Sequence, residues 1–393
     1  MIKDRYIHKA VTKDLEEKMV FIGGPRQVGK TTLSRLIGTS DFGDYGYFNW
    51  DSRSDRQQIL SGGFSAGHEL LIFDELHKYK NWKQYLKGLY DTEKEQFTIL
   101  VTGSARLDVY RRTGDSLLGR YHYYRLHPFS VAELNGFANS NTLVPHKPLV
   151  FKDPGKSNEL LERLIEFGGF PEPFVKADLV TLRRWQNERI DRLIKEDVRD
   201  LESLRDLSSL QILAELLPSK VGSLFSLNAL REELDVAHKT MALWTEVLER
   251  LYYHYRIYPF TTHLARTLKK EPKLYLWDWS EVPSAAARFE NVVASHLLKL
   301  VHFLHDAQGF KTELFYLRDS WGHEVDFIIT ENKKPWFAVE VKMADTEVSP
   351  HLHYYGERLK IPYLYQVVKT PGVHISNKGV QIISADRFLD ALV

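Results

Sequence analysis

Three short apolar runs in the first third of the chain predict strands that are buried on both faces. They cover residues 19–23, 70–73 and 98–101, and none of them alternates between polar and apolar positions. Uninterrupted runs of this length are typical of parallel sheets, whose two faces are covered by helices. The segments between the runs are long enough for crossover helices. The pattern therefore predicts an α/β domain with a parallel sheet.

The middle of the chain shows helical periodicity instead. Residues 136–160 are rich in Asn, Ser, Pro, Gly and Lys and predict a connector. Residues 182–205 predict one helix, with an apolar stripe on one face and ion-paired side chains on the rest of its surface. The next stretch predicts three helices, the third over residues 237–253, and a hairpin with strands at 255–260 and 273–277. This order of elements predicts a winged-helix module.

Composition and charge exclude several classes of protein. Of the 393 residues, 43% are apolar and 27% are charged, as in ordinary globular proteins. Lys and Arg total 53 against 52 Asp and Glu, so a uniformly basic coat is excluded and any DNA contact needs a local patch. The absence of cysteine excludes disulfides, zinc fingers and a cysteine nucleophile. With no apolar run of ~18 residues and no signal-peptide core, we expect a cytoplasmic protein without membrane contact.

The clearest chemical motif lies directly after the first apolar run. It matches the pattern G-x-x-x-x-G-K-[ST] with the residues Gly24-Pro25-Arg26-Gln27-Val28-Gly29-Lys30-Thr31. Its glycines let backbone N–H groups surround a phosphate, and the N-terminus of the helix that follows favours negative charge. Lys30 is expected to reach the β- and γ-phosphates of ATP, and the Thr31 hydroxyl to bind Mg²⁺. The strand before the motif and the helix after it make a chance glycine turn the weaker interpretation.

Two adjacent acids, Asp74 and Glu75, follow the second apolar run. In a chain that already contains a phosphate loop, acids at the end of a buried strand indicate the second half of an ATP site. Asp74 is expected to hold the magnesium through water, and Glu75 to polarise the attacking water. A helix N-terminus, whose dipole also favours acids, is the alternative.

Polar residues after the third apolar run are weaker candidates for the same site. Thr102 and Ser104 occupy the place of a sensor of the γ-phosphate or of the attacking water, although an ordinary turn explains them nearly as well. Arg106 and Arg120 are candidate arginine fingers, which stabilise negative charge in the transition state.

The third helix of the predicted winged-helix module is a candidate DNA contact. It begins near His238, Lys239 and Thr240, and the N-terminal residues of a recognition helix enter the major groove. The basic residues expected at the wing tip are Arg266, Lys269 and Lys270. Three acids just before the helix weaken the local positive field, so a surface that packs against protein is an equal alternative.

A second constellation of charged residues lies near the C-terminus. Asp326 precedes one apolar run, Glu340 and Lys342 close the next, and the polar turn at 330–334 predicts a hairpin. The period of two places Glu340 and Lys342 on one face, where Asp326 of the neighbouring strand joins them. A divalent metal, Mg²⁺ or Mn²⁺, would remove the repulsion between the carboxylates and activate water, with Lys342 near a scissile phosphate. Glu290 is a candidate third carboxylate, and surface ion pairs on an edge hairpin are the alternative.

The motifs as a set resemble those of prokaryotic AAA+-type P-loop ATPases fused to a C-terminal domain of the PD-(D/E)xK nuclease superfamily. The matching segments, in chain order, are Gly24-Pro25-Arg26-Gln27-Val28-Gly29-Lys30-Thr31-Thr32, Phe73-Asp74-Glu75, Thr102-Gly103-Ser104, Leu118-Gly119-Arg120, Pro128-Phe129-Ser130, Phe167-Gly168-Gly169-Phe170-Pro171-Glu172, Glu196-Asp197, Pro272-Lys273-Leu274-Tyr275, Glu324-Val325-Asp326-Phe327 and Glu340-Val341-Lys342. The resemblance implies that ATP binds the loop that ends in Thr32. It also implies an intact nuclease-like site, because Glu290, Asp326, Glu340 and Lys342 are all present.

The expected organisation has four parts. They are a P-loop ATPase domain (1–135), a helical lid or connector (136–207), a winged-helix module (208–277) and an α/β PD-(D/E)xK-like domain (278–393). The first interpretation is an ATP-hydrolysing protein that acts on DNA and carries a metal-dependent nuclease-like domain. The alternatives are an ATP-dependent switch that binds DNA or a protein partner without cleaving, and an ATPase directed only at proteins. A homo-oligomer is compatible with each.

Overall fold

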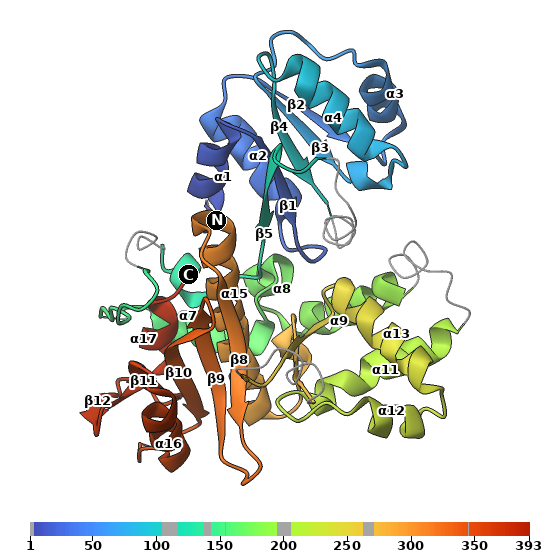
Figure 1. The fold of residues 1–393 in the computed structure, drawn as a ribbon. Coiled ribbons are helices and arrows are strands. Elements are labelled where there is room, and N and C mark those ends of the chain that lie inside the picture. Colours follow the sequence, from blue (N-terminus) through green and yellow to red (C-terminus); the bar gives the residue numbers. More distant parts are fainter. Residues whose placement is uncertain are drawn as a thin grey trace. The chain divides into compact units, whose positions relative to one another are not determined.

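The chain divides into two compact units, Met1–His127 and Pro128–Val393 (Figure 1). The structure is a computed structural model, and it describes residues 4–103, 117–136, 143–153, 155–194, 206–261, 271–344 and 346–393. The second unit takes in the predicted connector, the predicted winged-helix module and the predicted C-terminal domain.

The first unit contains a five-stranded parallel sheet with the order β2-β3-β4-β1-β5. Its strands are β1 (Met19–Gly23), β2 (Tyr45–Asn49), β3 (Leu70–Asp74), β4 (Thr98–Thr102) and β5 (Tyr121–Arg125). Its helices include α1 (His8–Leu15), α2 (Lys30–Asp41), α3 (Arg53–Ser61), the 3-10 helix η1 (Leu76–Lys78) and α4 (Trp82–Glu93). The predicted parallel sheet and its three buried strands are confirmed. The apolar pattern misses β2 and β5 because these edge strands are Tyr-rich and only partly buried.

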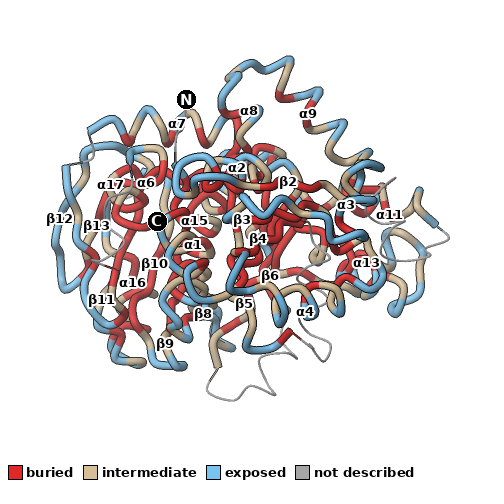
Figure 2. The backbone as a smooth tube through the Cα atoms, turned by 90° about the horizontal axis from the view of Figure 1, so that it is seen from above, coloured by how far each residue is buried: buried red, intermediate tan, exposed pale blue. Residues whose placement is uncertain are grey.

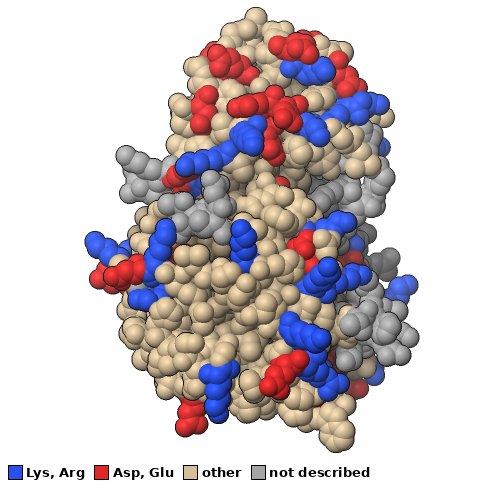
Figure 3. Space-filling view, turned by 60° about the vertical axis from the view of Figure 1, so that its left-hand side comes forward, with Lys and Arg blue, Asp and Glu red and all other residues tan. Residues whose placement is uncertain are grey.

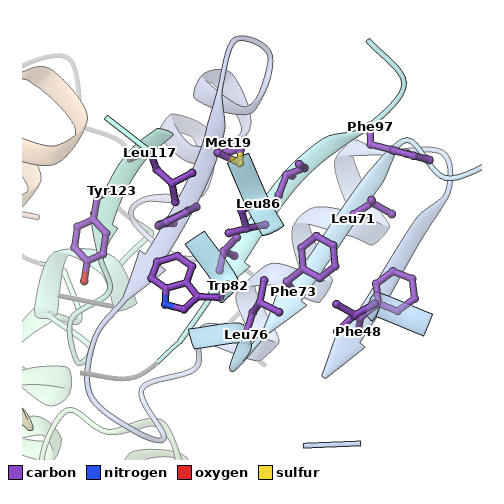
Figure 4. Packing of buried hydrophobic residues seen from close by; sticks show 14 residues of the cluster. Met19, Phe48, Leu71, Phe73, Leu76, Trp82, Leu86, Phe97, Leu117 and Tyr123 are labelled. Atoms are coloured by element: carbon purple, nitrogen blue, oxygen red, sulfur yellow. The ribbon is translucent and has the colours of Figure 1, made fainter. Parts of the chain in front are cut away.

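A layer of large apolar side chains covers one face of this sheet (Figure 4). Trp82 and Leu86 of α4 belong to the same buried cluster as Phe21 of β1 and Phe73 of β3. The rings of Phe21 and Trp82 lie 6.0 Å apart. Each fully buried side chain of this size contributes about 1.5–3 kcal/mol. The layer fixes β3 in the sheet, and with it Asp74 at the end of this strand and Glu75 directly after it.

The second unit begins with helices. They include α6 (Val131–Leu134), α7 (Ser157–Phe167), α8 (Pro171–Lys176), α9 (Leu179–Arg192), α11 (Leu207–Leu216), η3 (Leu217–Lys220), α12 (Leu227–Glu233) and α13 (His238–Arg250). The antiparallel strands β6 (His254–Ile257) and β7 (Lys273–Leu276) follow. The helix expected over 237–253 is therefore observed as α13, and the expected hairpin as β6 and β7. Of the helix expected over 182–205, α9 covers the first part, and residues 195–205 lie outside the described ones.

The C-terminal part is built on a six-stranded mixed sheet with the order β12-β13-β11-β10-β9-β8. After the 3-10 helix η4 (Trp279–Glu281), its elements are α15 (Ala285–Gln308), β8 (Thr312–Arg318), β9 (Glu324–Glu331), β10 (Lys334–Lys342), α16 (Pro350–Leu359), β11 (Tyr363–Val368), β12 (His374–Asn377), β13 (Val380–Ser384) and α17 (Ala385–Asp390). Strands β8, β9 and β10 run antiparallel, and β11 returns parallel to β10. The predicted hairpin is confirmed as β9 and β10. Its turn is tighter than expected, with Asn332 and Lys333 both at positive φ.

The charged side chains at the surface reflect the nearly equal numbers of basic and acidic residues in the sequence. On the face shown in Figure 3, Lys and Arg side chains are interspersed with Asp and Glu. The edge strand β12 is exposed along its length (Figure 2). Among the residues that the structure describes, no helix combines the length and the apolar character needed to cross a bilayer.

Candidate nucleotide site and carboxylate cluster

The phosphate loop connects β1 to the N-terminus of α2. Gly24 has φ +143°, and a Cβ there would lie 2.5 Å from the backbone oxygen of Leu126. Gly29, directly before α2, has φ +99° and adopts the left-handed conformation that glycine tolerates without a steric cost. The Lys30 ammonium turns back into the loop and donates to the carbonyls of Gly24 (3.0 Å) and Pro25 (2.7 Å). Lys30 is thus buried, and its ammonium points into the loop. A bound phosphate could accept the hydrogen bonds that these two carbonyls now accept.

A buried arginine near the N-terminus braces the same loop. Arg5 donates from Nη1 to the carbonyl of Val28 at 2.7 Å and from Nη2 to the carbonyl of His127 at 2.5 Å. These charged hydrogen bonds join the loop to the segment that follows β5. Sequence reasoning missed Arg5, because it lies outside the phosphate-loop motif.

Asp74 is the centre of a buried hydroxyl network at the end of β3. Its Oδ2 accepts hydrogen bonds from Thr31 Oγ1 and Tyr47 OH, both at 2.7 Å, and its Oδ1 accepts one from Thr102 Oγ1 at 2.6 Å. Burial and the Asp74 carboxylate raise the pKa of Tyr47 to about 12, so Tyr47 stays a hydrogen-bond donor. The pairing of Thr31 with Asp74 provides the oxygen ligands that Mg²⁺ prefers. The residues present therefore fit a nucleotide-bound magnesium ion.

Two of these contacts differ from the sequence-based expectation. Thr102, expected near the γ-phosphate, is fully buried, and its hydroxyl donates to Asp74. Tyr47 belongs to none of the sequence motifs. It comes close to Asp74 because its strand, β2, pairs with β3 in the folded sheet. Both residues orient Asp74 in this structure.

Glu75 lies directly after β3 in a left-handed backbone conformation, with φ 57°. Its Oε2 lies 3.6 Å from both His77 Nε2 and Lys78 Nζ. Burial raises the pKa of Glu75 above its ordinary value, and nearby Lys30 and Lys78 oppose this shift. A carboxylate with a raised pKa is a better proton acceptor for water near neutral pH.

The candidate arginine fingers are not part of this network. Arg120 pairs with Asp91 through two hydrogen bonds, at 2.8 and 3.1 Å. It directly precedes β5, whereas the phosphate loop follows the neighbouring parallel strand β1, so Arg120 lies at the opposite end of these strands from the loop. Ser104 and Arg106 lie outside the described residues.

The candidate DNA-contacting helix is α13. His238 and Lys239 are exposed at its N-terminus, and Thr240 is partly buried. The opposite face of α13 is buried, as the periodicity predicts, by side chains that include Trp244 and Leu248. The expected wing-tip residues Arg266, Lys269 and Lys270 lie outside the described residues.

The C-terminal constellation forms on β9 and β10. Phe327 pairs with Val339, so Asp326 lies opposite Glu340 one step further along the same register. Asp326 Oδ2 accepts from the Val341 amide at 2.9 Å. Lys342 Nζ lies 2.9 Å from Glu340 Oε1, as expected for two residues on one face of a strand.

Glu340 is held in an unfavourable environment for a carboxylate. Its side chain is 8% exposed, and its Oε2 has no hydrogen-bond partner among the described residues. Burial and the neighbouring Asp326 charge raise the pKa of Glu340 to about 7. A buried oxygen without a donor carries a desolvation cost that a bound cation would remove, so this atom fits a metal ligand.

Strand β7 adds two residues to this cluster. Lys273 Nζ lies 2.7 Å from Glu324 Oε1, 3.3 Å from Asp326 Oδ1 and 3.5 Å from Glu290 Oε1. Tyr275, two residues along, donates to Glu290 Oε1 at 2.7 Å. Burial alone would lower the pKa of Lys273, but the surrounding carboxylates raise it above its ordinary value.

The sequence predicts β7 within the winged-helix module (208–277) and the acids that Lys273 contacts within the C-terminal domain (278–393). The structure brings these residues together within the second unit. Lys273 and Tyr275 are two positions apart in a strand and therefore share a face. This spacing was the sequence signal that could have identified them as neighbours in one site. Among the described residues, no group of three or more His, Asp or Glu side chains has the arrangement of a metal site. The Lys273 ammonium lies beside Asp326, one of the two carboxylates that the sequence predicts to hold a metal.

Comparison with known proteins assigns the first part of the chain. Residues 16–135 match the sequence model of a family described as an AAA domain. This part of the chain is therefore similar to AAA domains, and it carries the phosphate loop and the parallel sheet described above. The match and the loop geometry together support nucleotide binding and hydrolysis by the AAA+ domain. Residues 158–290 and 286–388 match two families described as domains of unknown function, DUF8612 and DUF4143.

Similarity over most of the chain is to proteins described as uncharacterized. An uncharacterized protein of Methanocaldococcus jannaschii is 23% identical over 377 residues, covering 90% of this chain and 82% of that protein. An uncharacterized protein of Mycobacterium tuberculosis is 24% identical over 347 residues, covering 84% and 71%.

Two solved structures that resemble the chain do so at low scores. The Aeropyrum pernix ORC1 protein in complex with DNA matches 74% of this chain and 93% of its own, with a TM-score of 0.34 and 12% identity. The Thermotoga maritima RuvB Holliday junction branch migration motor matches 67% and 94%, with a TM-score of 0.32 and 18% identity. Scores this low carry no inference about function.

Proposed function

We propose that the protein binds ATP with Mg²⁺ and hydrolyses it, and that this reaction drives or controls an action on DNA. The position of Asp74 supports the ATP reaction, because its carboxylate lies 2.7 Å from the Thr31 hydroxyl of the phosphate loop. Thr31 and Asp74, the latter through water, would hold the ion. When bound, Mg²⁺ neutralises negative charge on the phosphates.

Two further residues carry the hydrolytic chemistry. Lys30 would exchange its two loop carbonyls for the β- and γ-phosphates, at the N-terminus of α2 where negative charge is favoured. Glu75 would polarise the attacking water, and its raised pKa suits a general base.

The Asp74→Asn variant tests this site. The amide keeps the size of the side chain but removes the charge that orients three hydroxyl groups, so phosphate release should fall by about 10²-fold or more. The matched control is Asp44→Asn, since Asp44 is an exposed acid of the same unit whose carboxylate pairs with His68 at 3.1 Å. Wild-type hydrolysis by the Asp74→Asn variant would refute the proposed ATP site.

The action on DNA includes a second proposed reaction, cleavage of a phosphodiester at the cluster on β9 and β10. The buried Glu340 Oε2, which lacks a partner among the described residues and lies opposite Asp326, supports it. Asp326 and Glu340 would hold Mg²⁺ or Mn²⁺, with Glu290 nearby, and Lys342 would stabilise charge on the phosphate.

A nuclease assay with Mg²⁺ or Mn²⁺ tests the second reaction. Asp326→Ala and Glu340→Ala should abolish cleavage and leave ATP hydrolysis unchanged, because the two sites belong to different units. Lys342→Ala should retain metal binding and lose more than about 100-fold in cleavage rate. Equal cleavage by wild type and variants would contradict the assignment. Salt-dependent DNA binding without cleavage would favour the alternative, an ATP-dependent switch that binds DNA. If the protein neither binds nor cleaves DNA, an ATPase that acts on a protein partner is favoured.

We further propose a homo-oligomer in which Arg120 acts between copies. Because it lies at the end of the strands opposite the phosphate loop, it would act as a finger on the nucleotide of a neighbouring copy. ATP hydrolysis per molecule should then rise with protein concentration, and Arg120→Ala should remove this rise. A concentration-independent rate in the wild type would exclude this role.

A further inference from the structure

The carboxylate cluster of the second unit contains a buried lysine that no proposed reaction uses. The side chain of Lys273 is 4% exposed and lies within 3.5 Å of Glu290, Glu324 and Asp326. An ammonium group has three N–H donors, so one lysine can serve three carboxylates. Among the described residues, Arg318 and Lys342 also pair with acids of this cluster, and their side chains are 43% and 38% exposed. Lys273 therefore supplies the positive charge in the interior.

The contacts of Asp326 show what a second cation would meet. Its Oδ2 accepts from the Val341 amide at 2.9 Å, and its Oδ1 faces Lys273 Nζ at 3.3 Å. Glu340 Oε2, across the register, has no partner among the described residues. A divalent ion that bridged Asp326 and Glu340 would thus come close to the ammonium of Lys273, and two cations repel each other strongly in a site of low dielectric constant.

We propose that Lys273 is a built-in counter-cation that preassembles the carboxylates without metal, and that a divalent ion must displace its ammonium from Asp326 to bind. The inference rests on the proposed metal site at Asp326 and Glu340. It makes β7, a strand of the predicted winged-helix module, part of the control of the C-terminal site. Movement of β7 that withdraws Lys273 would then open the site to metal.

Calorimetric titration of the nucleotide-free full-length protein with Mn²⁺ tests the displacement, with thermal unfolding measured in chelator and in excess Mn²⁺. Lys273→Met should bind Mn²⁺ about 10-fold more tightly than the wild type or better, because the competing charge is gone. In chelator its melting temperature should fall, because buried carboxylates lose their partner, and Mn²⁺ should restore it. Lys273→Gln is the substitute if the Met variant does not fold.

Lys299→Met is the matched control. Lys299 is also a buried lysine of the second unit, and it pairs with Glu133 at 2.6 Å and donates to Ser130 at 2.7 Å. This variant should lose thermal stability in chelator without recovering it in Mn²⁺. Recovery of the control by Mn²⁺ would show that the rescue is unspecific and overturn the inference.

The remaining outcomes separate this inference from the proposed function. Equal Mn²⁺ affinity of the wild type and the Lys273 variants would overturn the role of Lys273 and leave the metal site standing. Absence of Mn²⁺ binding in the wild type and in the Lys273 variants alike would overturn the metal site itself, and the inference with it. Binding that Asp326→Ala abolishes in the Lys273→Met background would place the ion as proposed.

Discussion

Replacing Glu75 by glutamine separates nucleotide binding from hydrolysis. The amide has the size of the carboxylate and can still contact water, but it cannot accept a proton. A positioned general base contributes about 10²–10⁴-fold to a rate. Phosphate release should therefore fall by this factor, which corresponds to about 3–5 kcal/mol in the activation free energy.

The contacts of Glu75 set the expected change in stability. Its Oε2 lies 3.6 Å from His77 Nε2 and Lys78 Nζ, and the side chains of Glu75 and Lys78 are 20% and 24% exposed. Partly exposed ion pairs of this kind contribute about 0–1 kcal/mol. The free energy of unfolding should thus change by less than about 1 kcal/mol, and the Kd for ATP should stay within a few-fold of the wild-type value.

Three measurements check this prediction: phosphate release under saturating ATP, ATP binding by calorimetry, and urea unfolding. Glu75→Gly is a useful second variant, because glycine adopts the observed φ of 57° without the strain of about 1–3 kcal/mol that a side chain stores there. It should lose hydrolysis and unfold at higher urea. A wild-type rate of phosphate release by Glu75→Gln would refute the assignment of Glu75 as the base.

The remaining predictions concern the phosphate loop, the α13 helix and the buried acid of β10. Lys30→Ala should abolish hydrolysis and most ATP affinity, because the phosphates lose their buried counter-charge; calorimetry that finds unchanged affinity would contradict this. Lys239→Ala should weaken DNA binding and reduce its salt dependence, and an identical salt slope would indicate a surface for protein. The raised pKa of Glu340, about 7 because of burial and Asp326, means that the folded protein holds a proton that the unfolded chain has released. The free energy of unfolding should therefore fall as pH rises from about 4.5 to 7, by about 2–3 kcal/mol, and Glu340→Gln should flatten this dependence in urea titrations.

Several features of this protein follow from contiguous sequence. The phosphate loop, the acids at the end of β3, and the hairpin of β9 and β10 each lie within one short segment. Their geometry depends on local rules: glycines at positive φ, uninterrupted apolar runs, and the period of two that places Glu340 and Lys342 together. The sequence pattern is therefore sufficient to predict the parallel sheet, the hairpin and the position of the phosphate loop between a strand and a helix.

The partners of those residues depend on packing between distant segments. Tyr47 reaches Asp74 only because β2 pairs with β3, and Lys273 reaches Asp326 only because β7 lies against β9 in the folded unit. No local periodicity records which strands become neighbours, since burial of the shared core decides that. The sequence alone thus determined which groups can do chemistry, and the tertiary structure decided that a lysine of β7 supplies the cation beside Asp326.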